Sequence, residues 1–182
     1  KIKLFLILSS TIFIFFTFYL GLNKNNYYTT KNIVYKKIEN FESYEFFSNK
    51  KISFKNISPD KKFIILNIWS SWCLPCRKEH KNLTELRENI EADLIGLNYK
   101  DKFENAKSFL SELGNPYDII LKDKNGLISI EIGAYGVPET YLINNINKKI
   151  IKKYLGPINE ENIKEIQTLV NQWTVNLISS YY

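Results

Sequence analysis

The sequence FIILNIWSSWCLPC, residues 63–76, joins an almost wholly apolar run to two closely spaced cysteines. The run from Phe63 to Ile68 has the composition of a central strand that is covered on both faces of a sheet. After Cys76, apolar residues recur at spacings of three and four among charged ones, which predicts an amphipathic helix. These apolar residues are Leu83, Leu86 and Ile90. The cysteines are therefore expected where a buried strand ends and a helix begins.

Further periodic segments lie on both sides of this unit. Upstream, residues 43–47 and 51–54 are expected to form two short strands that could pair. Downstream, strands are expected at residues 94–97, 119–121, 140–143 and 149–154, and helices at residues 102–113 and 163–173. Asn-rich turn residues predict a hairpin between the last two strands. Right-handed crossovers between parallel strands would place helices on both faces. The sequence thus predicts an α/β fold with a mixed sheet flanked by helices.

The N-terminal part contains 19 uncharged residues, Leu4–Leu22, preceded by Lys1 and Lys3. As a helix, this run would come close to spanning the roughly 30 Å hydrocarbon core of a membrane. A cleaved signal peptide has a shorter apolar region and a small-residue cleavage site, which the ending Tyr19–Asn23 lacks. We therefore expect an uncleaved transmembrane helix, with its N-terminus in the cytoplasm and the rest of the chain outside it.

These segments divide the 182 residues into four expected parts: a membrane anchor at residues 1–23, a polar linker at 24–40, a folded domain at 41–173 and a C-terminal tail without an assigned role at 174–182.

The chain is 45% hydrophobic and 24% charged, which is typical of a folded protein. Its formal net charge is +6, but the lysines are scattered. A nucleic-acid groove would need a basic stripe with stacked aromatic residues, so we expect no nucleic-acid partner.

Cys73 and Cys76 are the only cysteines in the sequence. A structural disulfide is one possibility, but closing so small a loop restrains the unfolded chain very little. A zinc site would need two further ligands, and His80 is the only other His or Cys residue. The position at a helix N-terminus favours redox chemistry, because the helix end stabilises a thiolate at Cys73. Cys76, one turn further on, would then resolve a mixed disulfide.

Four segments carry a resemblance to a known family. They are WCLPCRKEH at residues 72–80, GLNYKD at 96–101, ELGNPY at 112–117 and YGVPET at 135–140. In this order and spacing they resemble the thioredoxin-like, periplasmic thiol:disulfide interchange proteins of cytochrome c maturation (CcmG/DsbE type). The resemblance extends over residues 43–173 and fits the expected N-terminal anchor. It implies a thioredoxin-like mixed sheet.

The resemblance also implies roles for residues outside the cysteine pair. Val137-Pro138 would be a cis peptide that faces the cysteines, with Pro138 in the catalytic site and Val137 offering backbone groups to an extended substrate. Asn67 stands where generic thioredoxins carry a buried acid, so Glu79 becomes the candidate for acid–base catalysis. Glu139 is a second acid expected near the substrate. Trp72, beside the motif, either packs locally or contacts substrate. A solvated surface acid is the alternative for both glutamates.

The function implied by the resemblance is that of a dedicated reductant in an oxidising compartment. Its dithiol would reduce the disulfide in the CxxCH haem-attachment segment of apocytochrome c, or a mixed disulfide with a maturation partner. A transmembrane electron donor would re-reduce the Cys73–Cys76 disulfide, and no other cofactor or metal is expected. The enzyme would be a single-pass protein of the inner membrane with its catalytic domain in the periplasm. The alternatives are a general extracytoplasmic disulfide reductase and, in a different class, a copper-binding thioredoxin-fold module.

Overall fold

The structure is a computed structural model that describes residues 2–22 and 34–179. The chain forms two compact units, Lys1–Thr30 and Lys31–Tyr182, which are described separately. Residues 24–33 of the expected linker and residues 180–182 of the expected tail lie outside the described residues.

The first unit contains a single described helix, α1 (Ile2–Leu22). It is 21 residues long, it has a mean hydropathy of 2.1, and none of its residues is buried. At about 1.5 Å per residue, its length is close to the hydrocarbon thickness of a bilayer. The helix is therefore long and apolar enough to cross a membrane.

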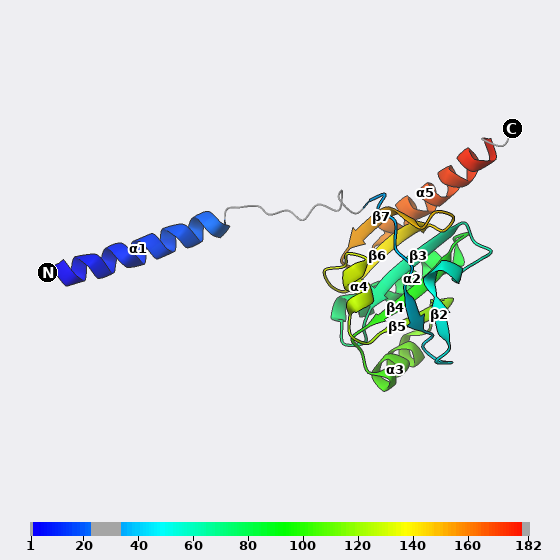
Figure 1. The fold of residues 1–182 in the computed structure, drawn as a ribbon, viewed down its shortest axis with the longest axis horizontal. Helices are drawn as coiled ribbons and strands as arrows, with labels where there is room; N and C mark the ends of the chain where they lie inside the picture. The colour runs from blue at the N-terminus through cyan, green and yellow to red at the C-terminus, as the bar shows by residue number, and fades with distance from the viewer. Residues whose placement is uncertain (1, 23–33, 180–182) are drawn as a thin grey trace. The chain divides into compact units, whose positions relative to one another are not determined.

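The second unit is built on a five-stranded mixed sheet. Its strands are β3 (Phe63–Trp69), β4 (Asp93–Tyr99), β5 (Ile119–Asp123), β6 (Glu139–Asn144) and β7 (Lys149–Leu155). They lie in the order β5-β4-β3-β6-β7, as Figure 1 shows. The pairs β3–β4 and β4–β5 are parallel, whereas β6 is antiparallel to both β3 and β7. The mixed sheet, its central apolar strand and the β6–β7 hairpin confirm the sequence predictions.

The three long helices of this unit pack on the same face of the sheet. They are α2 (Leu74–Glu88), α3 (Phe103–Leu113) and α5 (Glu160–Ser179), and they bury side chains such as Phe109 and Ile166 in one core. The other face is covered by the short helix α4 (Leu127–Glu131) and by the segment that precedes β3. Helices on both faces were expected, and the structure has them, although the three long helices share one face and only the short α4 lies on the other. Two successive right-handed crossovers that proceed in one direction across a sheet place both helices on one side.

The segment that precedes β3 also covers both edges of the sheet. It includes an antiparallel pair, β1 (Glu42–Tyr44) and β2 (Lys51–Ser53), and a short 3-10 helix, η2 (Phe54–Asn56). At one end it forms a β-bridge with β7, and at the other β1 is followed by a bridge to β5. Covered edges leave few unpaired backbone groups for association with other chains.

Two boundaries differ from those expected. Tyr35 donates its backbone N–H to the carbonyl of Ile150, and Ile38 is buried in the second core, so the folded domain begins before residue 41. The expected linker had been assigned on polar composition, to which backbone pairing is insensitive. At the other end, α5 continues to Ser179, so the first six residues of the expected tail are helical. Helix α4 (Leu127–Glu131) was not predicted, because five residues are too few for a helical period to show.

Candidate redox site

The two cysteines form a disulfide at the end of β3, with their Cα atoms 5.3 Å apart. Cys73 is the N-cap residue of α2, and Cys76 lies in the first turn. The Cys73 Sγ accepts a hydrogen bond from the backbone N–H of Cys76 at 3.1 Å. Pro75 occupies the start of the helix, where a missing N–H costs little. The strand, the cysteine pair and the helix are thus joined as predicted.

The two sulfurs differ in their position at the end of helix α2 more than in their exposure to solvent. In this disulfide form, Cys73 is 4% exposed and Cys76 is 2% exposed, so exposure does not separate the two cysteines. Only the Cys73 sulfur caps the helix, where an N–H group and the positive end of the helix dipole meet it. After reduction, this environment favours the thiolate at Cys73.

The loop between β3 and α2 is held by the loop that follows β4. The Asp101 carboxylate accepts hydrogen bonds from both the backbone N–H and the hydroxyl of Ser71. Ser70 donates its hydroxyl to the carbonyl of Tyr99 at 2.9 Å. Trp72 donates its indole N–H to the carbonyl of Lys100 at 3.2 Å, and its side chain is largely exposed. The loop therefore presents Trp72 outward from a fixed backbone beside the cysteines.

Glu79 lies on the buried face of the cysteine helix α2 and is only 1% exposed. Its Oε1 accepts a hydrogen bond from the Asn67 amide at 3.0 Å, and its Oε2 accepts one from the backbone N–H of Ile158 at 2.8 Å. Burial raises the pKa of Glu79 to about 7, although these two hydrogen bonds act in the opposite direction. Glu79 is thus a buried group that can exchange a proton near neutral pH, and its reading as a solvated surface acid was wrong.

Asn67 links Glu79 by hydrogen bonds to two buried hydroxyl groups. Its amide nitrogen also donates to the Thr140 hydroxyl at 3.0 Å, and its carbonyl oxygen accepts from the Tyr117 hydroxyl at 2.8 Å. Burial, followed by the negative charge of Glu79, raises the pKa of Tyr117 well above its ordinary value. Tyr117 therefore acts as a neutral donor. Sequence reasoning assigned no partner to Asn67, because these residues are far apart in the chain.

The Val137-Pro138 peptide bond is cis, as the family resemblance implied. Val137 is partly buried and packs against the core that includes both cysteines. The loop that carries it therefore borders the same core as the disulfide. Glu139, the next residue along, is buried, with contacts to Tyr135, Gly136, Tyr141 and Lys153. It lies inside the domain, so its reading as a solvated acid was wrong.

His80 is a packing residue. Its Nε2 lies 2.9 Å from the carbonyl oxygen of Gly114, and its ring meets Phe109 edge to face. Burial lowers its pKa, which favours the neutral ring. Among residues 2–22 and 34–179, no group of three or more His, Cys, Asp or Glu side chains could hold a metal ion.

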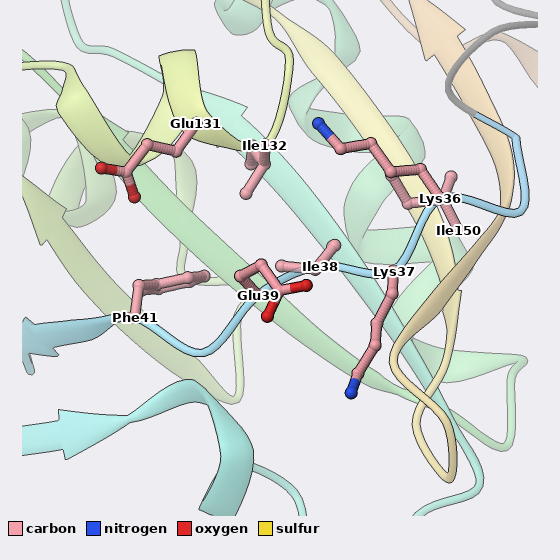
Figure 2. Close-up of a pocket in the computed structure, with 8 residues that line it drawn as sticks. All are labelled: Lys36, Lys37, Ile38, Glu39, Phe41, Glu131, Ile132 and Ile150. Atoms are coloured by element: carbon pink, nitrogen blue, oxygen red, sulfur yellow. The ribbon is translucent and has the colours of Figure 1, made fainter.

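A cavity of about 250 Å³ lies on the face of the sheet that carries α4. It is lined by residues 36–41 of the segment before β1 and by the end of α4 (Figure 2). Ile38, Phe41 and Ile132 supply apolar lining, and Lys36 and Glu131 lie at its margin. Neither cysteine lines this cavity, so it is separate from the disulfide site.

Comparisons with known proteins agree with this site. The Redoxin family model matches residues 36–170. The chain is 44% identical over 104 residues to thiol:disulfide interchange protein CycY of Rhizobium leguminosarum bv. viciae, covering 57% of this chain and 55% of the relative. It is 30% identical over 155 residues to "Probable thiol:disulfide interchange protein DsbE-2" of Pasteurella multocida, covering 85% and 79%.

The extent of these matches differs between relatives. The chain spans about half the length of the first curated relatives it matches. Among solved structures, the thioredoxin domain of a thiol-disulfide oxidoreductase from Bacteroides vulgatus superposes with a TM-score of 0.63 at 16% identity, covering 75% of this chain and 97% of that domain. At this identity the likeness shows the fold alone. The chain therefore belongs to the Redoxin family, as a thioredoxin-like relative of the DsbE-type thiol:disulfide interchange proteins.

Proposed function

We propose that the protein is a thiol–disulfide oxidoreductase that reduces disulfides in other proteins. The observation that carries this proposal is the Cys73–Cys76 disulfide, with the Cys73 sulfur capping α2. In the dithiol form, the Cys73 thiolate attacks a substrate disulfide, forming a mixed disulfide and releasing one substrate thiolate. The Cys76 thiolate then attacks the Cys73 sulfur and releases the second substrate thiolate. Two electrons pass to the substrate, and the enzyme is left with its own disulfide.

The neighbouring residues exchange the proton and bind the substrate. Glu79 exchanges the proton that accompanies the two thiol states, because its pKa of about 7 leaves both of its forms available at neutral pH. Trp72 and the loop at Val137-Pro138 contact the substrate chain. Glu139 contributes to substrate binding through its hydrogen bonds to the backbone of that loop, rather than by touching the substrate.

The biological role that best fits is reduction during cytochrome c maturation. The support is the family resemblance of the four motifs, together with relatives named as thiol:disulfide interchange proteins. The substrate would be the disulfide of the apocytochrome c CxxCH segment, or a mixed disulfide with a maturation protein. A transmembrane electron donor would restore the Cys73–Cys76 dithiol.

The location that fits this role is the periplasmic face of the inner membrane, with α1 as a single-pass anchor. Its length and hydropathy support the proposal. So do the hydroxyls of Thr11 and Thr17, each of which donates to a backbone carbonyl of its own helix at 2.9 Å. Polar groups satisfied within the helix are compatible with a lipid environment.

Trapping with Cys76→Ser tests the proposal. Without the resolving thiol, the mixed disulfide on Cys73 should persist and can be identified by mass spectrometry after non-reducing purification. Cys73→Ser is the matched control and should trap nothing. Capture of a CxxCH-containing chain or a single maturation thiol protein supports the specific role. Capture of many unrelated exported proteins would indicate a general reductase, and equal capture by both variants would contradict the assignment of the nucleophile.

A further inference from the structure

Lys153 is a fully buried lysine on β7, with a side chain that is 0% exposed. Its Nζ lies 2.8 Å from Oε2 of Glu139, which is also buried, and it donates to the carbonyl of Gly133 at 2.8 Å. The second oxygen of Glu139, Oε1, accepts the backbone N–H groups of Tyr135 at 2.9 Å and Gly136 at 3.2 Å. The ion pair thus holds three backbone groups in the four residues before Val137-Pro138.

A β-bulge directs Lys153 to this position. The register between β6 and β7 shifts at Ile151, which has no partner opposite it. Lys152 on one side of the strand pairs with Glu165 of α5, whereas Lys153 stands opposite Tyr141 on the other face. Strict alternation continued from the start of β7 would have pointed Lys153 toward the helices. Bulges next to functional sites commonly re-aim a single side chain in this way.

The cost of burying the Lys153–Glu139 ion pair indicates that the pair fixes the conformation of the loop rather than adding to the stability of the fold. Removing two charges from water is costly, and well-packed apolar residues often replace a buried ion pair with no loss of stability. Here each charge is surrounded by hydrogen-bonding groups, and the Lys153 ammonium also lies 5.0 Å from the ring centroid of Tyr135 and 5.2 Å from that of Tyr141. A satisfied buried network of this kind fixes a loop in one conformation.

We propose that Lys153 is a positioning residue for substrate binding. Through Glu139 and Gly133 it fixes the loop whose Val137 backbone receives the substrate chain. This inference rests on the proposed function, because it concerns how the same site recognises an extended peptide. Lys153 acts only through the loop.

The test compares two substrates with the reduced full-length protein in detergent micelles. One is a synthetic peptide with an internal CxxCH disulfide, and the other is an aromatic disulfide without a peptide backbone. Lys153→Met should lower kcat/KM for the peptide at least tenfold, mainly through KM, and lower the peptide-to-aromatic rate ratio by a similar factor. Lys153→Arg should restore part of that loss. Lys152→Met, which breaks the exposed pair on the same strand, should leave the ratio within twofold.

Hydrogen exchange supplies a second readout. Exchange at the amides of Tyr135 and Gly136 should accelerate at least tenfold in Lys153→Met, with the amides of α2 unchanged. If Lys153→Met does not fold, Lys153→Met combined with Glu139→Gln takes its place, because no charge is then left buried alone. An unchanged peptide-to-aromatic ratio in the folded variant would overturn the inference. A wild-type protein that reduces neither substrate would instead refute the proposed function.

Discussion

Replacing Glu79 by Gln removes one ionisable group from the buried face of the cysteine helix and keeps the side-chain volume nearly constant. Glu79 accepts one hydrogen bond on each carboxylate oxygen, from Asn67 and from the backbone of Ile158. A Gln side chain offers one acceptor and one donor group at these positions. Rotation of the Asn67 amide would accommodate the new donor, because the Tyr117 and Thr140 hydroxyls can exchange donor and acceptor roles. Any remaining cost of the substitution is independent of pH.

The pH-dependent part follows from the pKa of Glu79, which burial raises from 4.5 to about 7. Below pH 4.5 the carboxyl is protonated in both the folded and the unfolded chain, and its stabilising contribution is complete. Between pH 4.5 and 7 the unfolded chain releases the proton while the folded domain keeps it, so folding loses stability as the pH rises. A change of about 2.5 in pKa corresponds to about 3 kcal/mol. Relative to wild type, Glu79→Gln should therefore gain about 3 kcal/mol of stability between pH 4 and pH 8.

The assay is urea unfolding of the oxidised full-length protein in detergent micelles, followed by tryptophan fluorescence at several pH values. The informative quantity is the difference in unfolding free energy between variant and wild type, because the other titrating groups cancel in it. Glu112→Gln is the matched control, since Glu112 is an exposed acid paired with Arg77 on the neighbouring helix. An exposed pair of this kind contributes at most about 1 kcal/mol.

A difference between Glu79→Gln and wild type that stays flat from pH 4 to pH 8 would refute the reasoning, as would one that falls with rising pH. Either result would mean that Glu79 is solvated or paired with a cation in the folded protein. The same variant has a second readout. A deprotonated Glu79 disfavours a second negative charge nearby, so Glu79→Gln should lower the pKa of Cys73 in the reduced protein by about one unit. The thiolate ultraviolet absorbance as a function of pH measures this change.

Three further predictions test other parts of the structure. In the reduced protein, iodoacetamide should alkylate Cys73 much faster than Cys76, because only Cys73 caps the helix; peptide mapping that finds equal rates would contradict this assignment. Asp101→Ala should lower the unfolding free energy by about 1.5–3 kcal/mol, because Asp101 accepts charge-assisted hydrogen bonds from the cysteine loop, whereas Glu91→Ala at an exposed pair should cost under about 1 kcal/mol. Helix α1 should keep the protein in the membrane pellet after carbonate extraction, and a soluble periplasmic form that starts near residue 23 would argue against an anchor.

The sequence was sufficient where a pattern is local and strong. All seven residues of β3 are buried, as its apolar run predicted, and α2 follows directly after the cysteines. The hydrogen bonds of Glu79 and Asn67 could not be predicted, because their partners lie 12 to 79 residues away in the chain. A pattern of spacing within one element carries no information on such contacts.

Lys153 shows how an available signal can be misread. The segment KIIKKY, residues 149–154, was predicted to be a strand, and its lysines were counted among the scattered ones. In a strand, two adjacent lysines point to opposite faces, so at least one of them must enter a covered face unless the strand lies free on both sides. With apolar residues also adjacent at Ile150 and Ile151, the segment breaks the period of two and indicates a bulge. That break would have indicated that one of the two adjacent lysines faces the covered side of the sheet, and only the structure identifies it as Lys153.

The buried ionisable side chains of the described domain point to a common purpose. Apart from His80, the acidic and basic side chains that are buried are Glu79, Asp123, Glu139 and Lys153. Glu79 joins the cysteine helix to the central strand, and the Glu139–Lys153 pair fixes the loop before Val137-Pro138. Asp123 accepts hydrogen bonds from the backbone N–H and the hydroxyl of Ser129, and so holds α4, which leads into the same loop. Each of these groups is costly to bury. Because all four support the two segments that must meet a substrate disulfide, the arrangement is better explained by precision at the site than by stability of the fold.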